Sequence, residues 1–202
     1  RHAAEQAAGE LALLAEGTTL TFAQLASRVA GVWRALGQQG VPLGPQAKVA
    51  VQAHNSVETL LVLLALCESG TPFVPLHPRL TPAEAAVLIA DAAPGAVLSG
   101  DAILELAQPP RSAAATAAAV MGFAALPPVE PMQPLAILYT SGTSGVPKGA
   151  VLSRAAFVAS AAASETNLGF LADERWLLCL PLCHVGGLSI VTRCLLSRRA
   201  IV

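Results

Sequence analysis

The stretch from Tyr139 to Gly149 reads YTSGTSGVPKG and combines three glycines, four serine and threonine hydroxyls and one lysine. Residues with small side chains let backbone N–H groups approach a polyphosphate closely, and hydroxyl groups add hydrogen-bond donors. The lysine ammonium can neutralise negative charge on phosphoryl oxygens. These residue types together predict a loop that binds phosphate groups.

The spacing of this loop differs from that of the Walker A loop. That loop needs GxxxxGK followed by serine or threonine, whereas Lys148 follows Pro147 and precedes Gly149. An ordinary glycine- and serine-rich turn between two strands is the alternative interpretation. Such a turn accounts for the glycines but not for four hydroxyls and a lysine together, and residue types alone leave both interpretations open.

The order of the residues resembles the S/T-S-G-S/T-S/T-G-x-P-K-G loop of the acyl-adenylate-forming superfamily, which includes acyl-CoA synthetases, luciferases and peptide-synthetase adenylation domains. The resemblance implies that ATP, with Mg²⁺, activates a carboxylic acid as an acyl-adenylate, and that CoA then accepts the acyl group as a thioester. It implies a catalytic role for Thr140 and Lys148. The implied contacts to the nucleotide phosphates are Thr140, Ser141, Gly142, Thr143, Ser144, Gly145 and Lys148.

Further motifs extend the resemblance over nearly the whole chain. Leu20-Thr21-Phe22 with Leu25 looks like the superfamily's first helix start. Asn55-Ser56 looks like its N-S-x-E helix start, and Gly70 to Leu76 looks like its G-x-x-x-x-P-L strand. Arg154 stands where many relatives carry histidine, so no role is assigned to it.

A second candidate site is the segment Leu180-Pro-Leu-Cys-His184, which resembles the superfamily's L-P-x-x-H segment. The histidine of that segment lines the acyl pocket, so the resemblance implies a catalytic and substrate-binding role for His184. A lone histidine is otherwise commonly a core residue with satisfied hydrogen bonds. An imidazole at the mouth of an apolar pocket would donate to the acid's carboxylate or stack on an aromatic ring.

The residues that follow, VGGLSI with a nearby Arg193, look most like those of the o-succinylbenzoate–CoA ligases. This resemblance adds Gly186, Gly187 and Ser189 to the expected substrate contacts, since a substrate lying against backbone needs residues without side chains. Plain entry into a helix with one polar face is the alternative. Other acyl-CoA ligases, for aryl or fatty acids, also remain open.

Strand and helix patterns alternate along the first hundred residues, which predicts an α/β fold with mostly parallel sheet layers and helices on both faces. Thr21 with Gln24, and Thr81 with Glu84, form capping boxes, and Asn55 with Glu58 is expected to cap a buried helix. The predicted elements are a helix over 22–36, a strand over 48–52, a helix over 57–67, a strand over 73–76, a helix from 82 and a strand over 96–99.

The second half of the chain is expected to carry the chemistry. Residues 1–110 form the first βα units, 111–134 an alanine- and proline-rich surface connection, and 135–202 the phosphate loop and the start of the acyl pocket. The predicted elements are strands over 135–140 and 149–152, a helix from Ser153 to Leu168, a strand over 176–180, a helix over 188–196 and a strand opening at 200–202.

The resemblance also indicates what lies outside residues 1–202. The superfamily's magnesium-binding glutamate, ribose-binding aspartate and C-terminal-domain lysine have no counterpart in this sequence. A strand at 200–202 would also leave a sheet edge unpaired. We therefore expect a partial N-terminal domain that works with a C-terminal domain of its own chain and is inactive by itself. A natural short relative that binds nucleotide or acyl ligand without catalysis is the alternative.

Composition narrows the class of protein. Of 202 residues, 54% are hydrophobic and 12% charged, with a formal net charge of -1, which argues against disorder and against nucleic-acid binding. The longest apolar run is too short to span a membrane, and no signal peptide is visible, so a cytoplasmic protein is expected. Self-association is left open.

The cysteines show no disulfide spacing, which predicts reduced thiols. Cys179 and Cys183-His184 lack a second ligand pair in sequence, so no metal site of the chain's own is expected.

Overall fold

The computed structural model describes residues 1–202 except 16, 110–111, 141–146, 170 and 172. The elements in chain order are α1 (His2–Gln6), β1 (Leu11–Ala15), β2 (Thr18–Thr21), α2 (Phe22–Gln38), β3 (Val49–Gln52), α3 (Val57–Glu68), β4 (Phe73–Leu76), α4 (Pro82–Ala92), β5 (Ala96–Leu98), α5 (Gly100–Leu106), α6 (Ala113–Ala124), β6 (Pro134–Thr140), β7 (Lys148–Ser153), α7 (Arg154–Leu168), β8 (Arg175–Trp176), α8 (Val185–Ser197) and β9 (Ala200–Ile201).

Within the described residues, one sheet has five strands in the order β5-β3-β4-β6-β7. β3 pairs in parallel with β4 and β5, and β4 pairs in parallel with β6, whereas β7 turns back antiparallel to β6. The carboxyl ends of β3, β4 and β6 therefore lie at one edge of the sheet, where ligands of open α/β folds commonly bind.

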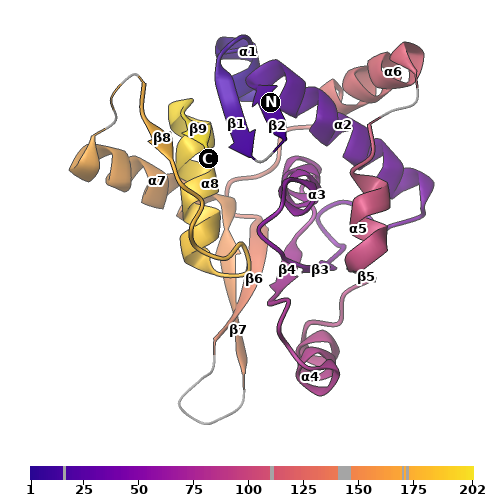
Figure 1. Cartoon of the computed structure of the whole chain (residues 1–202). Coiled ribbons are helices and arrows are strands. Elements are labelled where there is room, and N and C mark those ends of the chain that lie inside the picture. Colours follow the sequence, from indigo (N-terminus) through magenta and orange to yellow (C-terminus); the bar gives the residue numbers. More distant parts are fainter. Residues whose placement is uncertain (16, 110–111, 141–146, 170, 172) are drawn as a thin grey trace.

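Helices cover both faces of this sheet, with α3 above and α4 below it in Figure 1. Side chains alternate between the faces along each strand. Val49, Val51 and Phe73 belong to the main core with α2 and α3. On the other face Ala50, Val74 and Leu76 pack with Leu88 and Ala92 of α4. The predicted α/β fold with helices on both faces of a mostly parallel sheet is confirmed.

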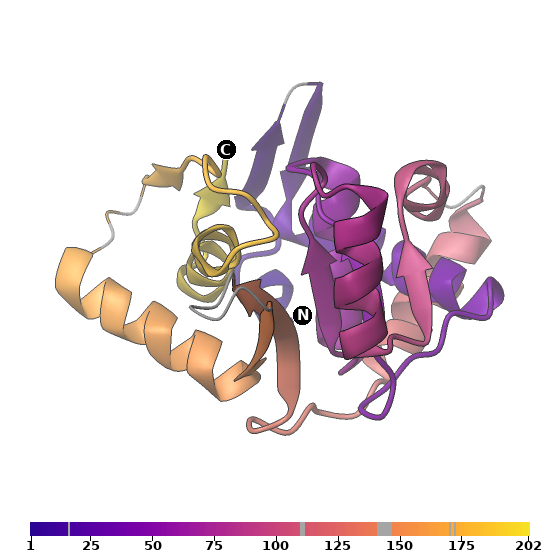
Figure 2. The same cartoon turned by 90° about the horizontal axis from the view of Figure 1, so that it is seen from below.

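The other sheet of the described residues has the order β2-β1-β9-β8. β1 pairs antiparallel with β2, and β9 lies between β1 and β8, parallel to both. Figure 2 shows the C-terminal end of the chain beside the β1–β2 hairpin. The expectation that the strand at 200–202 leaves an unpaired edge is therefore wrong, because this strand has a partner on each side.

Helix starts that depend on local sequence are confirmed. Both expected capping boxes are present, with Thr21 accepting from the N–H of Gln24 and Thr81 accepting from that of Glu84. Ser153 Oγ accepts from the N–H of Ala156 at the start of α7.

Other boundaries differ from the prediction. The N-cap of α3 is Ser56, whose hydroxyl accepts from Thr59 N–H, and not Asn55. β8 stops at Trp176 instead of reaching Leu180. α8 begins at Val185, three residues before the expected start.

The connecting segment contains a helix that its composition did not reveal. α6 packs on α2, with the rings of Trp33 and Phe123 5.9 Å apart. Arg34 Nη1 also donates to the carbonyl oxygen of Ala115 at 3.1 Å. Part of the segment expected to be a surface connection is therefore built into the core.

No helix among the described residues is both long enough and apolar enough to span a membrane.

Candidate functional site

The predicted phosphate loop joins β6 to β7. In the register of this hairpin, Thr140 pairs with Lys148 and Tyr139 pairs with Gly149. Thr140 is the last residue of β6 and Lys148 the first residue of β7, so they lie opposite each other at the end of the hairpin that carries the loop, which we call the mouth of the hairpin. Both residues are exposed. The remaining predicted phosphate contacts, Ser141, Gly142, Thr143, Ser144 and Gly145, lie outside the described residues.

Gly149 lets the two strands of this hairpin approach each other around the ring of Tyr139. A Cβ at position 149 would lie 2.9 Å from Ile137 Cγ2 and 3.2 Å from Tyr139 Cζ. The Tyr139 hydroxyl donates to Asp91 Oδ2 on α4 at 2.5 Å. Burial and this carboxylate raise the pKa of Tyr139, so the phenol stays protonated and anchors the hairpin to α4.

The segment that leads to His184 is held by Asn55. Asn55 Nδ2 donates to the carbonyl oxygens of Leu178 at 3.2 Å and Leu180 at 3.0 Å. The N–H of Leu182 donates to Asn55 Oδ1 at 2.8 Å. The residue expected to cap α3 instead uses its whole amide to fix the backbone of a segment more than 120 residues away in sequence.

The two glycines after His184 have different surroundings. A Cβ on buried Gly187 would lie 2.3 Å from the carbonyl oxygen of Pro181, a backbone atom that cannot move freely. A Cβ on Gly186 would meet only the mobile end of Leu180, at 2.7 Å. Gly187 is therefore required by the turn before α8, a structural reason that does not depend on a substrate. Ser189 lies half-buried in the second turn of α8.

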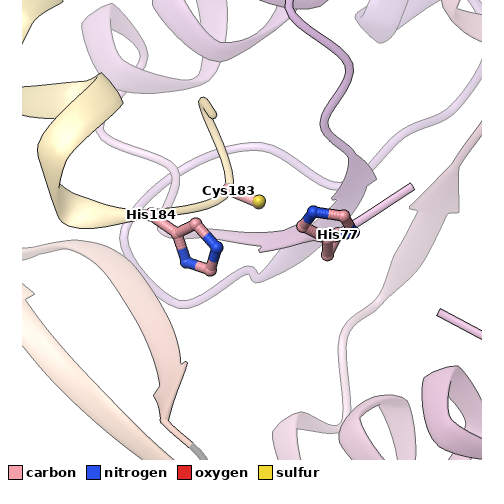
Figure 3. A group of neighbouring side chains, drawn as sticks. All are labelled: His77, Cys183 and His184. Atoms are coloured by element: carbon pink, nitrogen blue, oxygen red, sulfur yellow. The ribbon is translucent and has the colours of Figure 1, made fainter. Parts of the chain in front are cut away.

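His184 lies next to Cys183 of its own segment and next to His77 from a distant part of the chain. His77 directly follows β4, and Cys183 directly precedes His184, the N-cap of α8. The potential ligand atoms of these three side chains all lie within 4.8 Å of one another. Figure 3 shows the sulfur of Cys183 and a nitrogen of each ring facing the space between the two imidazoles. The ring centroids are 5.8 Å apart.

The protonation of this group depends on burial and on Arg79. Burial raises the pKa of the Cys183 thiol, while the guanidinium of Arg79 acts in the opposite direction. Loss of hydration lowers the pKa of His77, and so do the positive charge of Arg79 and the neighbouring imidazoles of His184 and His54, which favours the neutral imidazole. The N–H of Arg79 also donates to His77 Nδ1 at 3.1 Å.

His77 was not singled out from the sequence, although a usable signal was present. It follows a buried strand directly, and the carboxyl ends of parallel strands meet at one edge of a sheet. Because β4 and β6 run in parallel, His77 and Thr140 leave the sheet at this same edge. The structure thus brings the mouth of the phosphate-loop hairpin and the His184 segment to one side of one sheet.

Two arginines noted in the sequence have structural contacts. Arg154 Nη1 donates to the carbonyl oxygen of Cys67 at 2.6 Å and lies 3.2 Å from its sulfur, which ties the start of α7 to α3. The guanidinium of Arg193 lies 4.3 Å from the centre of the Trp176 ring, a cation–π contact between α8 and β8.

Solved structures share this architecture. The o-succinylbenzoate coenzyme A synthetase of Bacillus subtilis, in complex with ATP and magnesium, superposes with a TM-score of 0.82 at 22% identity, over 99% of this chain and 55% of that one. ATP-bound MatB of Rhodopseudomonas palustris superposes with a TM-score of 0.76 at 28% identity, over 95% of this chain and 41% of that one.

Sequence relatives include two acid–CoA ligases. The indoleacetate–CoA ligase of Aromatoleum aromaticum is 35% identical over 96% of this chain and 42% of its own length. The 2-succinylbenzoate–CoA ligase of Bacillus cereus is 34% identical over 88% of this chain and 37% of its own length. The chain spans about two fifths of the length of these relatives. The model of the AMP-binding enzymes matches residues 1–202, so the chain belongs to the AMP-binding enzyme family.

Proposed function

We propose that the full-length protein containing this chain is an AMP-forming acid–CoA ligase whose acid is 2-succinylbenzoate. The observation that carries the proposal is the placement of Thr140 and Lys148 at the mouth of the β6–β7 hairpin, on the sheet edge where His77 meets His184. A polyphosphate and an acid bound at this edge would lie on the same side of the sheet. Because the chain spans about two fifths of its relatives, the activity is proposed for the whole protein.

The residues at the hairpin mouth fit a nucleotide triphosphate. Lys148 supplies a compact positive charge and Thr140 a hydroxyl, and both side chains are exposed to an incoming ligand. The Mg²⁺ that accompanies ATP prefers oxygen ligands, and the hydroxyl oxygen of Thr140 is a donor of this kind. The family resemblance assigns the magnesium-binding glutamate to a segment outside residues 1–202.

The proposed reaction has two steps. A carboxylate oxygen of the acid attacks the α phosphorus of ATP, an oxygen–phosphorus bond forms, and pyrophosphate leaves. The sulfur of CoA, having lost its proton, then attacks the acyl carbon, and AMP leaves with the electron pair of the broken carbon–oxygen bond. Lys148 would neutralise charge that grows on the phosphate oxygens, since phosphoryl transfer depends on positioning and charge neutralisation. His184 would contact the acid.

The choice of acid rests on the His184 segment. The run from His184 to Ile190 looks most like that of o-succinylbenzoate–CoA ligases, and a relative of that name is 34% identical. With this acid we also propose a role in menaquinone biosynthesis, in the cytoplasm. An aryl acid such as indoleacetate is the second candidate, because the ligase of that acid is 35% identical.

The test offers the full-length protein 2-succinylbenzoate, indoleacetate, benzoate and a medium-chain fatty acid in turn, and measures pyrophosphate release and thioester formation with CoA. We expect the highest kcat/KM with 2-succinylbenzoate. A preference for indoleacetate or for the fatty acid overturns the choice of acid but leaves the ligase. Binding of ATP without pyrophosphate release with any of the acids would instead support the alternative of ligand binding without catalysis.

A further inference from the structure

The cluster of His77, Cys183 and His184 combines two imidazoles and a thiol from segments about 100 residues apart. Their potential ligand atoms lie within 4.8 Å of one another. Zn²⁺ bonds to histidine nitrogen at about 2.0–2.1 Å and to cysteine sulfur at about 2.3 Å, so tetrahedral ligand atoms lie about 3.3–3.7 Å apart. Coordination therefore requires these atoms to approach one another by at most about 1.5 Å.

The backbone that carries the cluster is held in place before any ion binds. His77 continues directly from β4, whose residues are all buried. On the other side, Asn55 fixes the backbone at Leu178, Leu180 and Leu182 with three hydrogen bonds. The N–H of His184 also donates to the carbonyl oxygen of Pro181 at 3.0 Å. A rigid backbone reduces the ordering cost of bringing ligands together.

The exposure of the cluster suits binding from solution. Cys183 is 5% exposed, whereas His184 is exposed and His77 half-buried. The sulfur therefore forms the floor of the site, and the imidazoles line its opening. An ion has an entry path, and a fourth position remains open to water.

The donor set selects the kind of ion. Imidazole nitrogen and thiolate sulfur favour Zn²⁺ and similar transition metals, whereas Mg²⁺ and Ca²⁺ prefer oxygen. From this geometry and chemistry we propose that His77, Cys183 and His184 form a Zn²⁺ site with three protein ligands, which is occupied when His184 does not contact the acid. On binding, a zinc–sulfur bond replaces the sulfur–hydrogen bond and the proton goes to solvent. The sequence did not predict this site, because its third ligand comes from a distant segment.

Binding rearranges one hydrogen bond. The N–H of Arg79 donates to His77 Nδ1. A neutral imidazole has one lone pair, so coordination through the other nitrogen moves the ring proton to Nδ1 and gives up this bond. One exchanged hydrogen bond is small beside a zinc–nitrogen bond.

The test titrates the full-length protein, first stripped with a chelator, with Zn²⁺ in competition with a chromogenic chelator. Co²⁺ serves as an optical probe, because a cobalt–thiolate bond gives charge-transfer absorption. We expect one Zn²⁺ bound through the cluster per chain and the cobalt–thiolate band. Loss of a direct ligand in Cys183→Ser or His77→Gln should weaken Zn²⁺ binding by more than ~100-fold, above the range for outer-shell changes. Cys183→Ser should also remove the thiolate band.

Matched controls come from residues outside the cluster. Cys179→Ser changes an exposed cysteine of the same segment, and His2→Gln changes an exposed histidine at the start of α1. Both variants should bind one Zn²⁺ with nearly unchanged affinity. Wild-type affinity in Cys183→Ser and in His77→Gln, or an equal loss in the controls, would overturn the proposal. Because His77 is partly exposed, His77→Gln tests the site even if Cys183→Ser folds poorly.

Discussion

Lys148 stands opposite Thr140 at the mouth of the β6–β7 hairpin, where its charge is free to meet a phosphate group. Phosphate oxygens carry more negative charge in the transition state than in bound ATP. Lys148→Ala in the full-length protein should therefore mainly lower kcat, by ~100-fold. Lys148→Arg keeps the positive charge, so its kcat should fall by less than that of Lys148→Ala. Pyrophosphate release measures both variants, and an unchanged kcat in Lys148→Ala would remove the lysine from the proposed chemistry.

His184 is expected to contribute to binding of the acid and not to binding of the nucleotide. If its imidazole meets the acid equally in the ground state and the transition state, His184→Ala should raise KM for 2-succinylbenzoate and leave KM for ATP nearly unchanged. His2→Ala, at the start of α1, is the histidine control. A variant that weakens ATP instead of the acid would show that the pocket assignment is wrong.

Asn55 is expected to act through the segment that it holds. Asn55→Ala removes three hydrogen bonds to the backbone over residues 178–182, and should cost about 1–2 kcal/mol of unfolding free energy since the site is partly open to water. KM for the acid should rise as well, because His184 then loses its fixed position. Denaturant unfolding and steady-state kinetics measure the two effects. Asn167→Ala, at the exposed end of α7, should change neither; a stable Asn55→Ala variant with normal KM would contradict this role.

At the scale of elements, α6 offers a direct test of its packing on α2. Phe123 is 4% exposed and contacts Trp33, whereas Met121 on the same helix is 74% exposed. Phe123→Ala should destabilise the protein by about 3–5 kcal/mol, and Met121→Ala should change stability by less than ~0.5 kcal/mol. Equal effects in denaturant unfolding would mean that α6 is only a surface connection.

Elements that depend on interactions between residues close in sequence could be predicted, whereas elements that depend on distant residues could not. The starts of α2, α4 and α7 were predictable, because a cap bonds to a backbone N–H only three residues away. α6 was not predicted, because its alanine-rich sequence has no apolar periodicity. The helix packs against Trp33, which is far away in sequence. Asn55 was misread for the same reason, since its partners lie beyond residue 177.

In the candidate site, too, the local feature could be predicted and the long-range contact could not. The hairpin could be expected from one continuous motif and is present in the structure, although Lys148, expected in the loop, is the first residue of β7. His77 could not be placed beside His184 from the sequence, because only the parallel order of β4 and β6 and the packing of α8 bring the two together.

At the scale of the whole molecule, we expect residues 1–202 by themselves to show no appreciable acid-dependent ATP–pyrophosphate exchange, while the full-length protein shows it. The reason is that the family's magnesium-binding glutamate, ribose-binding aspartate and C-terminal lysine have no counterpart here, and transition-state stabilisation needs these groups together. Exchange with radiolabelled pyrophosphate compares the two proteins. Robust exchange by residues 1–202 would show that the catalytic groups have been misplaced.

The position of β9 between β1 and β8 also determines when the strands of that sheet can pair during synthesis of the chain. Every strand of the five-stranded sheet has been made once residue 153 leaves the ribosome, and its parallel pairs join nearby segments. β1 must wait longer, because Leu13 pairs with Ile201 and the ribosome adds only about 5–20 residues per second. During that interval one edge of the β1–β2 hairpin stays open to other chains. Among the strands that the structure describes, the sheet that contains β1 is therefore paired later than the five-stranded sheet.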